Sequence, residues 1–430
     1  MMEKKRFLIK INYNELGVLL YVILVFFTPG PIALRTIIYR VSADKYFGSI
    51  GWLGYTFGAL SILALLTGIK YLFSYRNNDI NIGTLVLYLF LWNCIRVVIG
   101  ASNIFSYNDY SLFLSLITGY GGYILLKRYV HYEIEDAFDL IVILNFVTQC
   151  INIFAGRQLE YGGRYAAIGS TTGSVGIMCA SYLIYYLFCR KNEKRSMISI
   201  LACVLSILLA GSRFNLMIAI IFIILFAFKL RKGLELNDKK RKTVIILILV
   251  GILVVPFAYS YLGNTIFSKL LNRTEDVIGA ILGRDTSYVT DDLSFNARLL
   301  SLKAGLETII ENPLGISTSS IDLQAHTIKH GFTYFPHSTL ISYYLLWGIP
   351  AIIIFVSLIN HAVKAIKNNN TVWILALYFL VSFVLYGGPI IESKMYLWYF
   401  LMFDFIKNEA NSTYSCIENR DHIASIKGSA

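Results

Sequence analysis

The stretch FSKLLNRTEDVIGAILGRD (267–285), together with NPLGISTSSIDLQAHTIKHGFTYFPHS (312–338), decides how this chain is organised. Both belong to a long polar interruption from Gly263 to Pro336, and the rest of the chain is a series of apolar runs. A loop of this length is uncommon unless it is functional or a disordered linker, and this one carries helix signals. We therefore expect any chemistry to take place where this loop meets the membrane.

The composition is that of a membrane protein. The chain has 430 residues, of which 56% are hydrophobic and 15% charged, and its mean hydropathy is +0.62. Apolar runs of about 20 residues, enough to cross about 30 Å of hydrocarbon, recur along the chain. An outer-membrane barrel would show alternating segments of about ten residues instead. The sequence predicts an all-α polytopic integral membrane protein.

We predict about twelve membrane spans along the chain. They are 14–34, 49–73, 81–100, 110–126, 137–155, 169–189, 197–211, 213–229, 243–262, 338–359, 371–387 and 389–406.

Lysine and arginine set the expected orientation. The net charge of +12 is better explained by cytoplasmic loops than by nucleic-acid binding. With a cytoplasmic N-terminus, read as a retained signal anchor, the basic clusters all fall inside. These clusters are 127–128, 190–195, 229–242 and 364–367. Both termini are then cytoplasmic and the long loop is extracytoplasmic.

Four segments follow from this layout. They are an N-terminal membrane bundle of about nine spans (1–262), the extracytoplasmic loop (263–336), about three C-terminal spans (337–406) and a disordered cytoplasmic tail (407–430).

Two helices are predicted within the loop. Apolar residues over 267–281 recur at helical spacing opposite charged ones, which is typical of a helix on a membrane surface. A second helix is predicted over 297–311, with Asn296 or Ser294 as its N-cap and Pro313 just beyond its end.

Arginines at the external ends of the spans are candidates for binding an anion. Arg213 follows Ser212 at the tip between two adjoining spans, where an ionisable residue is costly. Snorkelling to lipid headgroups is the alternative explanation. Arg157 and Arg164 lie in a short external connection, against the orientation rule. They are equally explained as solvated loop charges.

The loop contributes further candidates. Arg298 begins the second predicted helix, and an exposed helix-face charge is the alternative. His337 opens the tenth span, and His326 and His330 precede it closely. Their spacing does not fit a zinc site, so we expect no metal.

Glu392 and Lys394 are charges at the start of the last span, with a local ion pair as the alternative explanation. The chain has six cysteines, and none lies in the long loop. No P-loop, GxGxxG or GxSxG pattern is present, which argues against nucleotide binding and serine hydrolysis.

Three elements together resemble the O-antigen polymerase and ligase family. They are the Ser212-Arg213 tip, the run RLLSLKAGLETIIENPLG (298–315) and the run HSTLISYYLLWGI (337–349). The sequence departs from the family pattern at Ser338, where Asn is frequent, and in the loop motif ending at Gly315, which lacks the usual second glycine. Polymerase and ligase therefore stay open.

The resemblance implies a GT-C-like bundle in the bacterial plasma (inner) membrane that catalyses an inverting glycosyl transfer at its outer face. Donor and acceptor would be glycans on undecaprenyl pyrophosphate, with membrane lipid and a chain-length regulator protein as partners and no cofactor, metal or nucleic acid. His337, Arg213 and Arg298 would be catalytic. The expected substrate-binding residues are Arg164, Arg157, Ser212, His330 and Glu392.

A polymerase joining repeat units is the first expectation, and a ligase acting on lipid A-core is the second. A lipid-linked oligosaccharide flippase or transporter is a further alternative, although flippases usually have short loops throughout. A membrane scaffold ranks last because it leaves the external arginines unexplained.

Overall fold

The structure is a computed structural model of the whole chain. It describes 107–129, 134–154, 165–168, 170–190, 196–212, 215, 218–225, 293–316, 327–331, 336–368, 370–385, 387 and 392–427, with single positions and runs of two or three residues between 17 and 98.

The regular elements of this described part are helices, which confirms the all-α class. They are α6 (Tyr107–Tyr129), α7 (Ile134–Phe154), α8 (Thr172–Ile184) continued by the π-helix η2 (Tyr185–Cys189), α9 (Ser196–Ala210), α14 (Leu293–Glu311), α16 (Thr339–Trp347), α17 (Pro350–Lys367), α18 (Val372–Leu385) and α19 (Ser393–Lys427).

Two helices of the described part are long and apolar enough to cross a membrane, namely α7 and the continuous Thr172–Cys189 helix. These two helices are consistent with a helical membrane protein. The number of spans, the position of the loop and the segment boundaries stay predictions.

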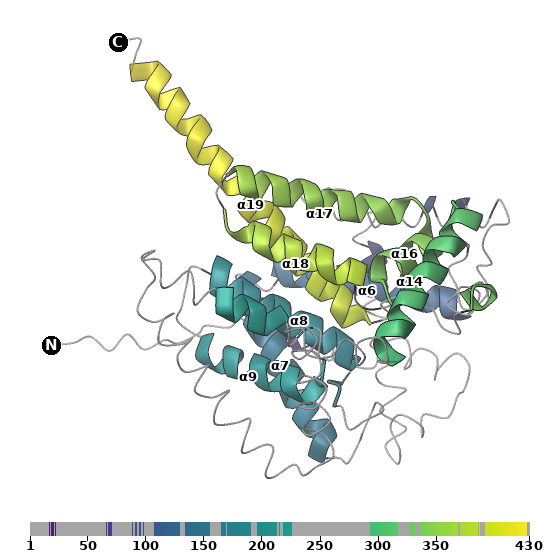
Figure 1. Cartoon of the computed structure of the whole chain (residues 1–430). Helices are drawn as coiled ribbons and strands as arrows, with labels where there is room; N and C mark the ends of the chain where they lie inside the picture. The colour runs from purple at the N-terminus through teal and green to yellow at the C-terminus, as the bar shows by residue number, and fades with distance from the viewer. Residues whose placement is uncertain are drawn as a thin grey trace, which may run out of the picture.

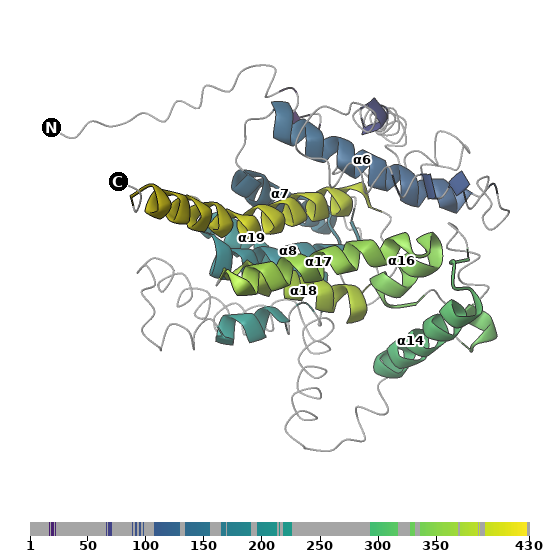
Figure 2. The ribbon, with the colours of Figure 1, turned by 90° about the horizontal axis from the view of Figure 1, so that it is seen from above.

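The helices form a layered bundle with α14 and α16 at one end (Figures 1 and 2). Helix α9 packs on α7 and α8, α17 packs along α18, and α19 packs along α6. We call one end of the bundle the Glu392 end, because Thr171, Ser212, Ser338 and Glu392 gather there. The opposite end, the Arg190 end, contains Arg190, Thr371 and Glu409.

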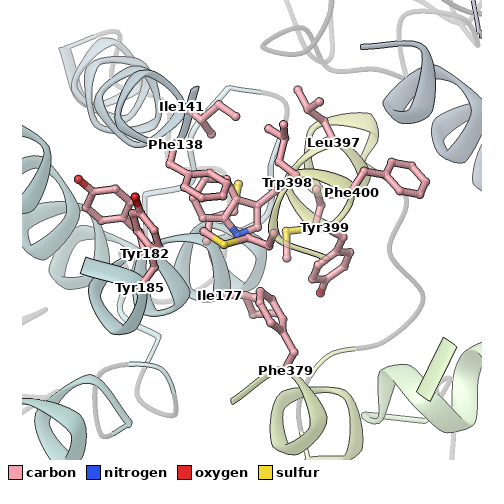
Figure 3. Close-up of a cluster of buried hydrophobic side chains, with 14 of the residues drawn as sticks. Phe138, Ile141, Ile177, Tyr182, Tyr185, Phe379, Leu397, Trp398, Tyr399 and Phe400 are labelled. Carbon is pink, nitrogen blue, oxygen red and sulfur yellow. The ribbon is translucent and has the colours of Figure 1, made fainter. Parts of the chain in front are cut away.

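An aromatic core joins α7, α8 and α19 (Figure 3). The ring of Phe138 lies 5.2 Å from that of Trp398 and 5.0 Å from that of Tyr185, between ring centroids. The Trp398 indole donates a 2.9 Å hydrogen bond to the Ser181 hydroxyl. The one polar atom of this large ring is thereby satisfied inside an apolar core, as buried tryptophan requires. The three helices therefore share a single core.

The tenth predicted span, 338–359, differs from the structure because the chain turns within it. Gly348 has a φ of +70° and caps α16, and α17 then begins with Pro350. Glycine tolerates this left-handed backbone, and proline is favoured in a first helical turn. The 338–359 segment is therefore two helices, and the second extends to Lys367.

Helix α19 continues to Lys427, into the segment for which a disordered tail was predicted. Its course just beyond the predicted span is fixed by side-chain contacts. The amide groups of Asn368 and Asn370 each donate a 2.8 Å hydrogen bond to the carbonyls of Ala410 and Glu409, respectively. The turn between α17 and α18 thus anchors α19, a tertiary contact that composition does not reveal.

A buried ion pair ties α7 to the end of η2. Arg190 contacts both carboxylate oxygens of Asp139, at 2.7 and 3.0 Å. The Tyr182 hydroxyl donates to the same carboxylate. Because both charges are buried, removal of one partner leaves the other without its main counter-charge in an apolar surrounding.

We expect Arg190→Met to lower the free energy of unfolding by about 3–5 kcal/mol, because it leaves the Asp139 carboxylate unpaired. Replacement of both residues, Asp139→Leu with Arg190→Met, should recover most of this loss. Thermal unfolding of the purified protein in detergent measures both. Equal losses in the single and the double variant would contradict the assignment.

Candidate functional site

The structure describes some of the predicted site residues with their side chains and not others. Arg157, Arg164 and Arg213 lie outside the described residues, so their roles stay predictions. Arg298 lies in α14, of which the backbone is described at that position. Ser212, His330, His337 and Glu392 are described with their side chains.

His337 lies at the Glu392 end, immediately before α16. Ser338 caps this helix by accepting a hydrogen bond from the Ile341 backbone N–H, and its hydroxyl donates to the Phe383 carbonyl at 3.2 Å. This cap fixes the start of α16 against α18. The His337 side chain is exposed, so it is accessible to a substrate.

Helix α14 docks against the same point. The His337 backbone N–H donates a 2.5 Å hydrogen bond to the hydroxyl of Ser301, a residue buried in α14. One turn further along, a Cβ at Gly305 would lie 2.6 Å from Ile341 and 3.0 Å from Pro336. Only a residue without a side chain lets α14 approach this closely.

The position of Arg298 follows from this docking. It lies three residues before Ser301, and residues three apart lie on one face of a helix. The loop helix therefore brings the Arg298 position to the start of α16. The helix begins at Leu293, so the prediction of Asn296 or Ser294 as its N-cap is wrong, and both residues lie in the first turns.

The Asn-Pro-Leu-Gly motif at 312–315 attaches the end of α14 to the end of α16. Gly315 has a φ of +83°, and a Cβ there would lie 2.8 Å from the Leu345 carbonyl oxygen. The next residue, Ile316, donates its backbone N–H to that same oxygen at 2.7 Å. Gly348 is equally tight, since its Cβ would lie 2.5 Å from the Leu314 carbonyl oxygen. The motif is thus a backbone-to-backbone joint.

His330 has a local partner set. Its Nδ1 lies 3.2 Å from a Glu307 oxygen, and its Nε2 lies 3.2 Å from a Glu311 oxygen, although the second contact lacks hydrogen-bond geometry. Both glutamates are on α14, one turn apart. His330 thus connects residues 327–331 to α14. Its predicted role in substrate binding is untested.

The Ser212 tip rests on α8. A Cβ at Gly176 would lie 2.8 Å from the Ser212 hydroxyl oxygen and 2.6 Å from the Asn215 side chain, so the tip lies against bare helix backbone. The Asn215 amide donates to the Ser212 hydroxyl at 2.8 Å, and the Tyr378 hydroxyl donates to the Asn215 amide oxygen at 2.9 Å. These bonds hold the chain on both sides of position 213.

Sequence reasoning missed Asn215 and Tyr378. Asn215 is fully buried, and an amide within an apolar run, three residues after Ser212, was a usable signal. Tyr378 gave no signal, because tyrosine is abundant in this chain and its partner is distant in sequence. Helix α18 joins both parts of the site, since it contacts the tip through Tyr378 and the start of α16 through Phe383.

Glu392 and Lys394 each bind uncharged groups of neighbouring segments. The Glu392 carboxylate accepts hydrogen bonds from the Thr171 N–H at 2.7 Å and the Ser174 hydroxyl at 2.6 Å. The Lys394 ammonium donates to the Asn145 amide oxygen and the Ile168 carbonyl, both at 2.9 Å.

Among the described residues, this end presents an exposed histidine, His337, together with an arginine position on α14 and polar groups at the start of α8. Within the described ranges, His, Cys, Asp and Glu do not gather in groups of three or more that could hold a metal ion. Such a set suits proton transfer and anion binding.

This arrangement is that of a helical membrane protein with a candidate site at one end of its bundle. Residues 198–356 match the family model described as O-antigen ligase. The matched segment contains the Ser212 tip, α14 and α16, so the resemblance to the O-antigen polymerase and ligase family is confirmed over these residues. The match suggests a glycosyltransferase-like enzyme of membrane-associated polysaccharide biosynthesis. No curated protein matches the chain.

The glycine joint yields a test with a matched control. Gly315→Ala should cost about 1–2 kcal/mol for its left-handed backbone and more for the clash with Leu345. Gly331 also has a positive φ, of +79°, but no described atom lies within 4 Å of its Cβ position. Gly331→Ala should therefore show the backbone cost alone. Thermal unfolding compares the two, and equal losses would contradict a tight joint at Gly315.

Proposed function

We propose that this protein is an inverting glycosyltransferase that joins undecaprenyl-pyrophosphate-linked repeat units of a surface polysaccharide. The single observation that carries the proposal is the docking of α14 on α16, at the hydrogen bond between Ser301 and the His337 backbone. It brings a histidine and an arginine position to one place within the segment that matches the family model.

The chemistry assigns a role to each group. A sugar hydroxyl of the acceptor attacks the anomeric carbon of the donor, the bond from that carbon to the pyrophosphate oxygen breaks, and the lipid pyrophosphate leaves. The hydroxyl proton passes to the His337 imidazole, because histidine is the side chain that most often serves as a general base. Arg213 and Arg298, with Arg164, would stabilise the negative charge that develops on the pyrophosphate.

A wider set of residues would bind the substrate. Arg157, Arg164, Ser212, His330 and Glu392 are the proposed substrate-binding set. Arginine is suited to pyrophosphate because its planar fork donates two parallel hydrogen bonds to phosphate oxygens.

The proposed setting is the outer face of a bacterial plasma membrane, with both termini cytoplasmic. The lysine and arginine distribution supports this orientation. It puts the Glu392 end outside and the Arg190 end inside, because Arg190 begins the 190–195 basic cluster. A chain-length regulator is the proposed protein partner.

A ligase that moves the finished glycan to lipid A-core is the second candidate. The description of the matched family, O-antigen ligase, favours it. It uses the same bond-making step with a different acceptor, so the same residues would serve.

Surface glycan from cells lacking the gene, displayed by chain length, tests the proposal. Loss of a polymerase leaves core with one repeat, whereas loss of a ligase leaves no repeat on lipid A-core. We expect His337→Ala and Arg213→Ala each to fail to restore long chains, because loss of a positioned base or charge slows transfer by about 100-fold or more.

His361→Ala is the matched control, since it removes a histidine of α17 that is outside the proposed site. It should restore long chains at a normal level of membrane protein. Full restoration by both His337→Ala and Arg213→Ala, at normal protein levels, would contradict the proposed site.

A further inference from the structure

Glu392 and Lys394 carry opposite charges, and both bind backbone groups of the same short segment. The Glu392 carboxylate accepts the Thr171 backbone N–H at 2.7 Å, and the Lys394 ammonium donates to the Ile168 carbonyl at 2.9 Å. Each charge thus takes the backbone group of complementary polarity. We call this pair, with its backbone contacts, the 392–394 clamp.

Both charges of the clamp are buried, with 8% of Glu392 and 1% of Lys394 exposed. Each has a second polar partner, Ser174 for the carboxylate and Asn145 for the ammonium. Buried charges are weak contributors to stability, because apolar residues of equal volume often serve as well. A role in fixing one conformation is the better explanation for keeping them.

The chain just before the clamp is held by a row of buried amides on α7. The Gln149 amide donates to the Tyr165 carbonyl at 2.9 Å, and the Asn152 amide donates to the Ala166 carbonyl at 2.8 Å. The Tyr165 N–H donates to the Leu209 carbonyl at 3.0 Å, at the end of α9. Side chains of α7 and α19 and backbone of α9 therefore fix the course of this short segment.

The segment is adjacent to a predicted anion-binding residue. Arg164 immediately precedes Tyr165 in the chain, and the segment ends at Thr171, the N-cap of α8. The same helix supports the Ser212 tip just over one turn later, through Gly176. A shift of the segment would therefore displace Tyr165, the residue that follows Arg164 in the chain, relative to the Ser212 tip.

We propose that Lys394 and Glu392 are positioning residues, which hold residues 165–171 so that Arg164 meets the pyrophosphate of the donor. This inference rests on the proposed function, because it takes the donor from it. For Glu392 it replaces the direct substrate contact proposed above with an indirect role, consistent with both of its carboxylate oxygens accepting hydrogen bonds from the start of α8.

Binding of undecaprenyl pyrophosphate to the full-length protein in lipid nanodiscs tests the inference. We expect Lys394→Met and Arg164→Ala each to weaken binding by about tenfold or more, the effect of one lost charge-assisted contact. The double variant should bind no more weakly than Arg164→Ala alone, because Lys394 acts through Arg164. A merely structural lysine would instead give losses that multiply.

Lys127→Met is the matched control. It also removes a lysine that contacts α19, through a 3.2 Å ion pair with Asp404, but far along the helix from the clamp. We expect it to leave binding unchanged. If Lys394→Met fails to reach the membrane, Asn152→Leu replaces it, since it releases the Ala166 carbonyl without removing a charge, and the same pattern is expected.

Two results would overturn the inference while leaving the proposed function intact. They are wild-type binding by the clamp variant, and multiplied losses in the double variant. Failure of the wild-type protein itself to bind undecaprenyl pyrophosphate would instead contradict the proposed donor and the inference with it.

Discussion

Direct backbone contact between the loop and the end of α16 is the constraint on which the candidate site depends. Gly315 and Gly348 each lie where an added Cβ would meet a carbonyl oxygen within 2.8 Å. This contact sets the register of α14 beside α16, so the two helices run in the same direction. Ser301 then meets the backbone at His337. The polar loop thus contacts the apolar bundle backbone to backbone, because these two positions carry no side chain.

The Glu392 end of the bundle is unusually polar for the interior of an apolar protein. Amides at Asn145, Asn152 and Asn215 each bind a defined partner there, as do the charges at Glu392 and Lys394. In a low-dielectric surrounding, satisfied networks of this kind favour a single arrangement. The proposed transfer, in which a pyrophosphate leaves, would need such rigidity, because fixed charges stabilise a transition state without reorganising.

The sequence predicts the helical class, and the ends of several helices to within a few residues, because apolar length and lysine placement are local signals. It also predicts the second loop helix, from its spacing and Pro313. The predicted span 338–359 runs through the break at Gly348, because an apolar sequence does not show that a glycine within it has a positive φ. The contacts of Ser301 with His337 and of Asn215 with Tyr378 were also missed, because they join segments distant in sequence. The surface helix predicted over 267–281 lies outside the described residues.

The central claim is that α14 docks on the start of α16, and a disulfide measures this most directly. An ideal Cβ at Gly305 lies 3.2 Å from the Pro336 Cβ, close to the separation of about 3.5–4.5 Å in disulfides. A side chain at position 305 would also meet Ile341, 2.6 Å from the same Cβ, so Ile341→Ala is included to make room for it. With the six native cysteines also replaced, Gly305→Cys and Pro336→Cys should crosslink in membranes under mild oxidation, and neither single cysteine variant should. If both cysteines react with a maleimide yet form no crosslink, α14 does not dock beside His337 and the account is wrong.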